Sequence, residues 1–261
     1  MATIYQVAER AGVSLSTVSR VLNGKTTVNA TLKAKVEKAM LELNYRPNSV
    51  ARSLATSRSD SVGILVSELN TPFFGDLMQG VESTLRVADK HVIITVGHNN
   101  LETEQDAVEF LISRNCDALI MHAEAMRDED LVALNEKRLP IALVNRQVTG
   151  LENNCIALDN EKGGYLATSH LLELGHKDIA YISGPMKIRD ACHRLKGHKR
   201  ALEEAGVPYN PMLTYEGKYE EEDGKIGLLE LLSRDTPFSA LVCANDWMAS
   251  GAMSCARDLG M

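Results

Sequence analysis

The chain opens with MATIYQVAERAGVSLSTVSRVLNG (residues 1–24), which reads as two short helices joined by a tight turn. Thr3 and Gln6 have the spacing of a capping box at the start of the first helix. Gly12 stands at the turn, where a positive φ is needed, and Ser14 is placed to cap the second helix. Apolar residues recur at helical spacing at Ile4, Val7, Ala8, Ala11, Val18, Val21 and Leu22. These signals predict a small helical unit at the amino end.

The outward face of the second predicted helix combines a leucine, three hydroxyl side chains and one guanidinium. Its residues are Leu15, Ser16, Thr17, Ser19 and Arg20. Small hydroxyl groups at a helix N-terminus approach a DNA duplex closely, and a guanidinium fork suits base edges and phosphates. The pattern therefore favours a helix-turn-helix that enters DNA. An ordinary helical hairpin on a larger domain is the alternative.

The charge of the chain is distributed unevenly. The whole chain carries a formal charge of −7, which by itself argues against a nucleic-acid partner. Residues 1–60, however, hold nine Lys and Arg against four acids, a net +5, and the remaining residues hold 19 against 31, a net −12. A basic head on an acidic body suits a polyanionic partner at one end only.

Length and cysteine usage indicate the class of protein. At 261 residues the chain suffices for one small and one large domain. The five cysteines are odd in number, and no pair has metal-ligand spacing, so we expect small buried apolar residues in a reducing compartment. No apolar run reaches membrane length and no signal peptide is evident. We expect a cytoplasmic, nucleoid-associated protein that needs no metal and no cofactor.

A third helix and a linker are predicted to follow the first two helices. Residues 29–43 have helical spacing, with one face formed by Leu32, Val36, Met40 and Leu43. Residues 48–56 allow only about two helical turns, and helices that short are marginal alone in water. We therefore expect this segment to become helical only against a partner.

Beyond Ser61 the pattern changes to alternating strands and helices. Buried strands are predicted at 62–66, 91–96, 118–121, 141–144, 155–158, 179–182 and 241–242. Helices are predicted between most of them, at 74–88, 102–113, 161–174 and 189–205. This alternation predicts a doubly wound parallel sheet, on which ligands bind beyond the carboxyl ends of the strands. Polar residues directly after strands are Ser67, Asn145, Asp159, Ser183, Asn245 and Asp246.

Several motifs together resemble the lac/galactose repressor family of bacterial transcription regulators. They include TVSRVLN (17–23), NYRPN (44–48), ARSLA (51–55), PFF (72–74), VNR (144–146), RLKG (194–197) and AND (244–246). CIALDN (155–160) and LATSHL (166–171) look most like the galactose repressor and its isorepressor. The resemblance implies an all-α helix-turn-helix head at 1–45, a hinge at 46–59, and an α/β effector-binding and dimerisation domain at 60–261. This body is expected to resemble periplasmic sugar-binding proteins, with one lobe at 60–158 and an incomplete second lobe at 159–261.

The resemblance also implies a homodimer that reads a palindromic operator. Leu15, Ser16 and Arg20 match base-reading positions, and Leu54 matches a hinge leucine that wedges into the minor groove. For Arg20, a clamp on a phosphate is the competing role, and for Leu54, a simple linker contact. The full set of expected DNA-binding residues is Thr3, Ser14, Leu15, Ser16, Thr17, Ser19, Arg20, Asn23, Asn48, Ala51, Arg52 and Leu54.

A cleft between the lobes is implied as the site of a small sugar effector such as galactose. Its expected lining residues are Ser67, Phe73, Asn145, Arg194, Tyr219, Asn245 and Asp246. Asn, Asp and Arg side chains pair with vicinal hydroxyls, and an aromatic ring covers the apolar side of a sugar. Whether the effector induces or co-represses stays open here, as does the operator sequence.

Family members are expected to continue for roughly 75 residues beyond Met261, in further strand–helix units. The expectation is therefore a fragment or a truncated product, and a truncated regulator that does not respond to effector is one alternative. The other alternative is a periplasmic-type sugar-binding protein without a DNA role, but such a protein would have a signal peptide and no basic head. No phosphate loop, nucleophile elbow or metal-spaced cluster supports an enzyme.

Overall fold

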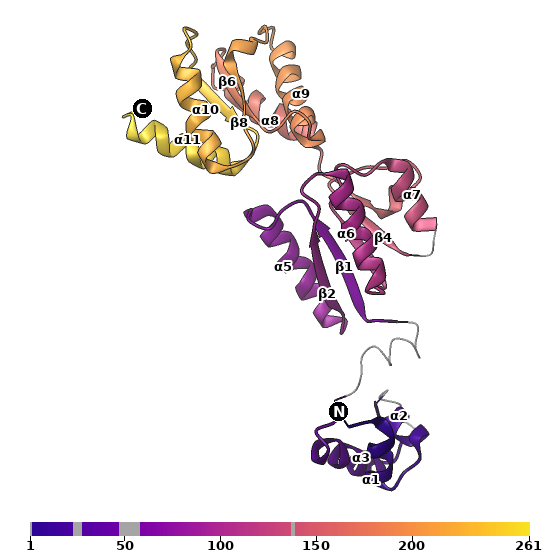
Figure 1. Ribbon diagram of the computed structural model, residues 1–261. Helices are drawn as coiled ribbons and strands as arrows, with labels where there is room; N and C mark the ends of the chain where they lie inside the picture. Colours follow the sequence, from indigo (N-terminus) through magenta and orange to yellow (C-terminus); the bar gives the residue numbers. More distant parts are fainter. Residues whose placement is uncertain (1, 23–27, 47–57, 137–138) are drawn as a thin grey trace. The chain divides into compact units, whose positions relative to one another are not determined.

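The computed structural model describes residues 2–22, 28–46, 58–136 and 139–261 (Figure 1). The chain divides into two compact units, Met1–Met121 with Ala133–Ile141, and His122–Val132 with Ala142–Met261. Within the described residues, no helix has both the length and the apolar character needed to cross a membrane. The predicted residues Asn23, Asn48, Ala51, Arg52 and Leu54, and most of the predicted hinge, lie outside the described residues.

The amino-terminal head consists of α1 (Ile4–Ala11), α2 (Leu15–Leu22) and α3 (Ala30–Glu42). The capping box is present: the Thr3 backbone N–H donates to Gln6 Oε1 at 2.8 Å, and the Gln6 backbone N–H donates to Thr3 Oγ1 at 3.4 Å. Gly12 ends α1 with φ of 64°, in the left-handed region that favours glycine. The predictions for both helix boundaries and for the turn are confirmed.

The core of the head contains Val7, Ala8, Val18, Val36 and Ala39, all buried. Half-buried apolar residues pack around it, among them Ile4, Ala11, Val21, Leu22, Met40 and Leu43. The prediction for Leu32 is wrong, because its side chain is exposed and lies outside this cluster. Leu32 sits in the first turn of α3, one turn before Val36, where the packed part of the helix begins.

The first sheet has five strands in the order β2-β1-β3-β4-β5. Its strands are β1 (Ser61–Val66), β2 (His91–Val96), β3 (Ala118–Met121), β4 (Ile141–Val144) and β5 (Cys155–Ile156). The helices along this part of the chain are α5 (Pro72–Val87), α6 (Leu101–Ser113) and α7 (Asp128–Glu136), and a 3-10 turn, Glu152–Asn154, precedes β5. Parallel register pairs β1 with β2 and β3, and β4 with β5.

Two strands of the first sheet differ from the prediction of fully buried strands. β5 is only two residues long, and Ile156 and Leu158 are exposed. β2 contains half-buried and exposed residues and no fully buried one. Both strands lie at edges of the sheet, where one side of the backbone has no neighbouring strand to cover it.

The second sheet has three strands in the order β7-β6-β8. They are β6 (Ile179–Ser183), β7 (Thr214–Glu216) and β8 (Ala240–Cys243), all in parallel register, and every residue of the central β6 is buried. Its helices are α8 (Asn160–Glu173), α9 (Arg189–Glu204), α10 (Glu221–Ser233) and α11 (Asp246–Asp258), with a 3-10 turn at Pro211–Leu213. The acidic run 220–223 lies at the start of α10, where negative charge stabilises the N-terminus of the helix.

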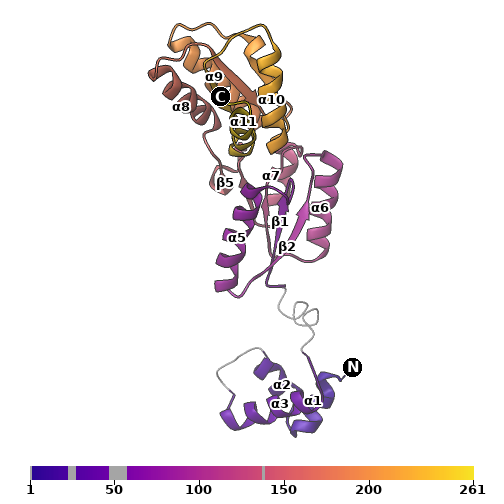
Figure 2. The same cartoon turned by 90° about the vertical axis from the view of Figure 1, so that its left-hand side faces the viewer.

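Two pairs of helices pack side by side around the second sheet, α8 with α9 and α10 with α11 (Figures 1 and 2). Glycines allow backbone to meet backbone in each pair. A Cβ on Gly164 would lie 2.0 Å from the Arg194 carbonyl oxygen, and a Cβ on Gly197 would lie 1.9 Å from that of Glu161. Gly224 and Gly251 have the same role between α10 and α11. The starts of α8 and α9 are thereby held close together.

The cysteines are all free, but the expectation that they are buried holds only in part. Cys116 and Cys255 are buried, whereas Cys155, Cys192 and Cys243 are half-buried. Cys155 lies on the edge strand β5 and Cys243 ends β8, so neighbouring elements cover these two side chains incompletely.

We predict that Gly164→Ala destabilises the protein by about 1–3 kcal/mol, because its Cβ would overlap the Arg194 carbonyl. Gly163→Ala is the matched control in the same helix. No atom lies within 4 Å of the added Cβ there, so helix propensity alone applies and stability should rise by about 0.5–1 kcal/mol. Urea unfolding curves measure both changes. Equal effects of the two substitutions would contradict the backbone contact between α8 and α9.

Candidate functional site

The N-terminus of α2 presents a cluster of hydroxyl groups. Ser14 Oγ lies 2.8 Å from Ser16 Oγ and 2.9 Å from Thr17 Oγ1. The Thr17 backbone N–H donates to Ser14 Oγ at 3.2 Å, which caps the helix as predicted. The first turn of α2 therefore offers hydroxyl groups that are oriented by their own neighbours.

α2 has one buried and one exposed face. Val18 is fully buried in the core of the head, whereas Leu15 is 37% exposed. Arg20 is exposed and makes no ion pair or hydrogen bond with the residues that the structure describes. Arg10, by contrast, donates from Nε to Glu42 Oε2 at 2.6 Å. The Arg20 guanidinium is thus available to an external acceptor.

Two exposed residues lie at the start of α1. Thr3, predicted to contact DNA, uses its side chain to cap α1. Tyr5, which sequence reasoning missed, is 69% exposed on the same helix. The missed signal was its position in α1 outside the apolar stripe, where an aromatic residue has no role in the core.

Hydrogen bonds link several polar side chains of the second unit into a network. Asn145, which follows β4, donates from Nδ2 to Asp190 Oδ2. Asn160, at the start of α8, donates from Nδ2 to Asp190 Oδ1 at 3.0 Å. Arg194 donates from Nε to Asn160 Oδ1 at 2.7 Å. Asn145 has a φ of 60°, so the backbone turns sharply where β4 ends.

Arg194 connects this network to the residue that follows β8. Its Nη1 donates to the Ala244 carbonyl at 2.5 Å, and its guanidinium lies 5.9 Å from the centre of the Tyr219 ring. Asn245 caps α11 through Oδ1, which accepts from the Met248 backbone N–H, and its Nδ2 donates to the Tyr219 carbonyl at 2.9 Å. Four of the predicted effector residues, Asn145, Arg194, Tyr219 and Asn245, are therefore linked.

The remaining predicted effector residues are Asp246, Ser67 and Phe73. Asp246 is the exposed first residue of α11. Ser67 and Phe73 belong to the other compact unit. There, Ser67 Oγ donates to Asn99 Oδ1 at 2.5 Å, and the half-exposed Phe73 ring packs edge-on against Phe74 at 5.1 Å.

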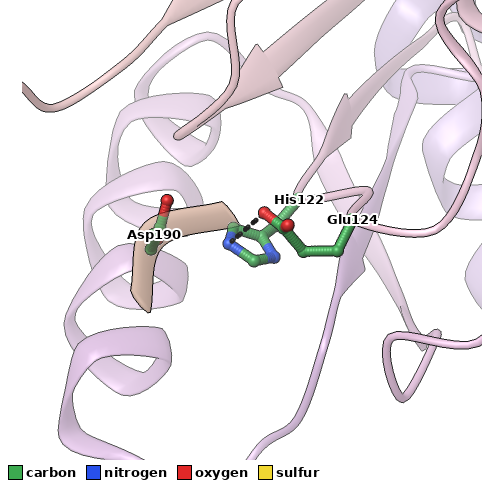
Figure 3. Close-up of side chains that lie close together, drawn as sticks. All are labelled: His122, Glu124 and Asp190. Atoms are coloured by element: carbon green, nitrogen blue, oxygen red, sulfur yellow. Dashed lines mark ion pairs between the residues drawn. The ribbon is translucent and has the colours of Figure 1, made fainter. Parts of the chain in front are cut away.

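His122, Glu124 and Asp190 form a cluster that sequence reasoning missed (Figure 3). One ligand atom of each lies within 4.8 Å of the others, and His122 Nε2 is 3.8 Å from Glu124 Oε1. One nitrogen and two carboxylates are donors of the kind that bind divalent metals. Spacing along the chain gives no signal here, because Asp190 comes from a distant segment that only folding brings to the other two.

Burial controls the protonation of this cluster. Desolvation lowers the pKa of His122 to about 4, so the imidazole is neutral at physiological pH. Burial raises the pKa of Asp190, against the opposing effects of Arg194 and Asn145. Burial likewise raises the pKa of Tyr219 to about 12, and the Tyr219 hydroxyl is buried without a hydrogen-bond partner among the described residues.

Arg146 fixes the segment that carries His122 and Glu124. Its buried guanidinium donates to the Ala123 and Met126 carbonyls and, at 2.5 Å, to Asp128 Oδ1. A charged group this deeply buried is retained only where acceptors satisfy it. Arg146 is therefore a positioning residue for the loop after β3.

The chain matches two family models. Residues 3–48 match "Bacterial regulatory proteins, lacI family", and residues 59–261 match "Periplasmic binding proteins and sugar binding domain of LacI family". The transcriptional regulator GalR of Escherichia coli (strain K12) is 40% identical over all of this chain and 76% of its own length. GalS of Salmonella typhimurium is 36% identical over all of this chain and 77% of its own length.

Solved structures agree with these matches. The Lac repressor dimer bound to operator and the anti-inducer ONPF has a TM-score of 0.87 and 31% identity, covering 100% of this chain and 78% of that one. The Escherichia coli repressor AscG has a TM-score of 0.69 and 27% identity, covering 77% of this chain and 73% of that one. The predicted resemblance is confirmed, and the chain belongs to the LacI family of bacterial regulatory proteins.

Proposed function

We propose that this transcriptional regulator is a homodimeric repressor that binds a palindromic operator and responds to a small sugar. The exposed face of α2 is the observation that supports the proposed binding to DNA. There, an exposed Arg20 and a hydroxyl cluster lie on the side of the helix away from the core-facing Val18. This arrangement is suited to a recognition helix in the major groove. The family membership of both parts of the chain supports the proposal.

The proposed domain division is a head at 1–45, a hinge at 46–59 and an effector-binding and dimerisation domain at 60–261, with lobes 60–158 and 159–261. We assign base contacts to Leu15, Ser16 and Arg20. The supporting DNA contacts are assigned to Thr3, Ser14, Thr17, Ser19, Asn23, Asn48, Ala51, Arg52 and Leu54. A protein that works this way acts in the cytoplasm at the nucleoid, and its role is binding rather than catalysis.

For the sugar, the proposed contacts are Ser67, Phe73, Asn145, Arg194, Tyr219, Asn245 and Asp246. The linked part of this set supplies amide and guanidinium groups beside an aromatic ring, which suits vicinal hydroxyls on a sugar. Galactose or a related sugar is the first candidate. The effector and the operator are proposed to be coupled, each changing the affinity for the other by the same factor.

We predict that Arg20→Ala weakens binding to selected operator DNA by about 1–3 kcal/mol and relaxes base preference at one position of each half-site. Lys38→Ala, which removes one exposed positive charge from α3 of the same head, is the matched control. Operators are first selected from random duplexes with the unaltered protein, and mobility shifts then measure both variants. An Arg20→Ala protein that weakens all sequences uniformly, as a phosphate contact would, contradicts base reading.

Operator affinity should fall steeply with salt, because Lys and Arg that neutralise phosphates release counterions. With about six or more phosphate contacts per dimer, the association constant should drop about a thousandfold or more between about 50 mM and about 200 mM salt. Mobility shifts or anisotropy titrations at several salt concentrations provide the slope. An operator affinity that does not change with salt concentration would contradict the proposal that the protein binds DNA.

We expect Arg194→Lys to lower galactose affinity about tenfold or more, because lysine keeps the charge but loses the fork. Arg200→Lys is the matched control on α9, since Arg200 pairs with Glu161 outside the polar network. Isothermal titration measures binding, and circular dichroism melting checks the fold. Equal affinities of the two variants would argue against Arg194 as a sugar contact.

A further inference from the structure

We propose that a cavity beside His198, near the starts of β6 and β8, is a second ligand site for a small uncharged ring compound that carries one hydroxyl or N–H donor. The His198 cavity has a volume of about 220 Å³, and all its lining residues belong to the second unit. Thr236 and Pro237, which precede β8, line it, whereas the proposed effector network reaches Ala244, which follows β8. The two sites are therefore distinct, and the inference does not depend on the proposed binding of a sugar.

Apolar side chains form one part of the wall of the His198 cavity. Ile179, Leu202 and Leu213 line it and are buried, and the half-buried Tyr209 adds an aromatic ring. A cavity of about 150 Å³ already admits a benzene ring, so the volume here suffices for one ring with a small substituent. Walls of this kind favour the apolar body of a ligand over a fully hydrated one.

His198 is the most deeply buried polar residue of the lining. It is 1% exposed, and its Nδ1 lies 2.9 Å from Thr168 Oγ1 on α8. Thr168 Oγ1 donates its one hydrogen to the Gly164 carbonyl at 2.9 Å, so it accepts a hydrogen bond from His198 Nδ1. The imidazole therefore holds its hydrogen on Nδ1, and Nε2 keeps a lone pair.

Burial keeps the imidazole of His198 neutral. Desolvation lowers the pKa of His198 to about 4, and the charge of Lys199 acts in the same direction. At neutral pH, Nε2 is therefore an acceptor only. Among the residues that the structure describes, none forms a hydrogen bond with Nε2. A hydroxyl or N–H group of a ligand would satisfy this acceptor.

Two aromatic contacts hold the His198 ring in place. The centre of the Tyr181 ring lies 4.6 Å from that of His198, and Tyr209 meets the imidazole edge-on at 6.3 Å. Tyr209 is itself anchored, since its hydroxyl lies 2.9 Å from Thr214 Oγ1. Because Nδ1 is also bound to Thr168, the ring cannot turn without losing these contacts. Nε2 is thus held in one direction, as a specific binding site requires.

The charges of the lining favour an uncharged ligand. Lys177 and Asp178 bring one charge of each sign to the exposed part of the lining, and the neutral imidazole adds none. An ionised group placed against His198 would lose its hydration without gaining a partner of opposite charge. A neutral donor avoids this cost.

Phenol and benzene are the probes, because they share one ring and differ in the donor. NMR titrations of the isotope-labelled full chain at neutral pH give both dissociation constants and identify the amides that shift. Amides of the lining should shift with both ligands. Phenol should bind about threefold to tenfold more tightly than benzene, since one additional hydrogen bond separates them. In spectra of the imidazole nitrogens, phenol should shift the Nε2 resonance of His198 more than benzene does.

Variants identify the residue responsible. His198→Phe keeps a planar ring but removes Nε2, so phenol should bind within about twofold of benzene. His170→Phe is the matched control, because His170 is exposed on α8 and does not line the cavity, and it should keep the preference for phenol. Val207→Phe enlarges a half-buried residue of the lining and should weaken the binding of both ligands about tenfold or more by filling the cavity.

His198→Phe also removes the partner of Thr168 and could prevent folding, which circular dichroism would detect. In that case Val207→Phe and the imidazole spectra of the unaltered chain provide the measurement.

Three outcomes would overturn the inference. Equal affinities of phenol and benzene for the unaltered chain would contradict a hydrogen bond to His198. Amide shifts that gather around Arg194 instead of the lining would place both ligands in the proposed effector site. Absence of saturable binding by either ligand, up to its solubility, would show that the cavity is not a ligand site.

Discussion

The carboxylate of Asp190 is the buried charge around which the polar end of the second unit is organised. A charge in this position is stable only when donors surround it, and Asn145 and Asn160 provide them. Arg194 then orients Asn160, so one carboxylate fixes the ends of several elements at once. The close approach of α8 and α9 at Gly164 makes this possible, because it brings Asn160 at the start of α8 near Asp190 and Arg194 on α9.

The small size of the head limits how its helices can pack. Three short helices have little apolar surface to share, so their core must use the inward faces almost completely, as Val7, Val18 and Val36 do. The outward face of α2 therefore contributes little to that core, although Ser14 caps the helix. Arg20 lies on that face and is exposed, so a partner rather than the core accounts for its placement.

Opposite charge requirements distinguish the two proposed sites. A surface that approaches DNA needs uncompensated cations, which residues 1–60 provide with a net +5. The linked residues of the second unit instead combine amide, carboxylate and guanidinium groups that bond to one another, a mixture of donors and acceptors that suits hydroxyl groups. The acidic body and the basic head of the sequence thus correspond to two kinds of ligand.

Sequence alone determined the helices of the head, the turn at Gly12 and the alternation of strands and helices. Local periodicity, capping and motif spacing control these features. The motifs also predicted the family and the role of Arg194 as a candidate contact. Only the tertiary structure decided that Leu32 lies outside the core and that β2 and β5 are edge strands. It alone brought His122 and Glu124 to Asp190, since contacts between residues far apart in the chain depend on packing that no local pattern encodes.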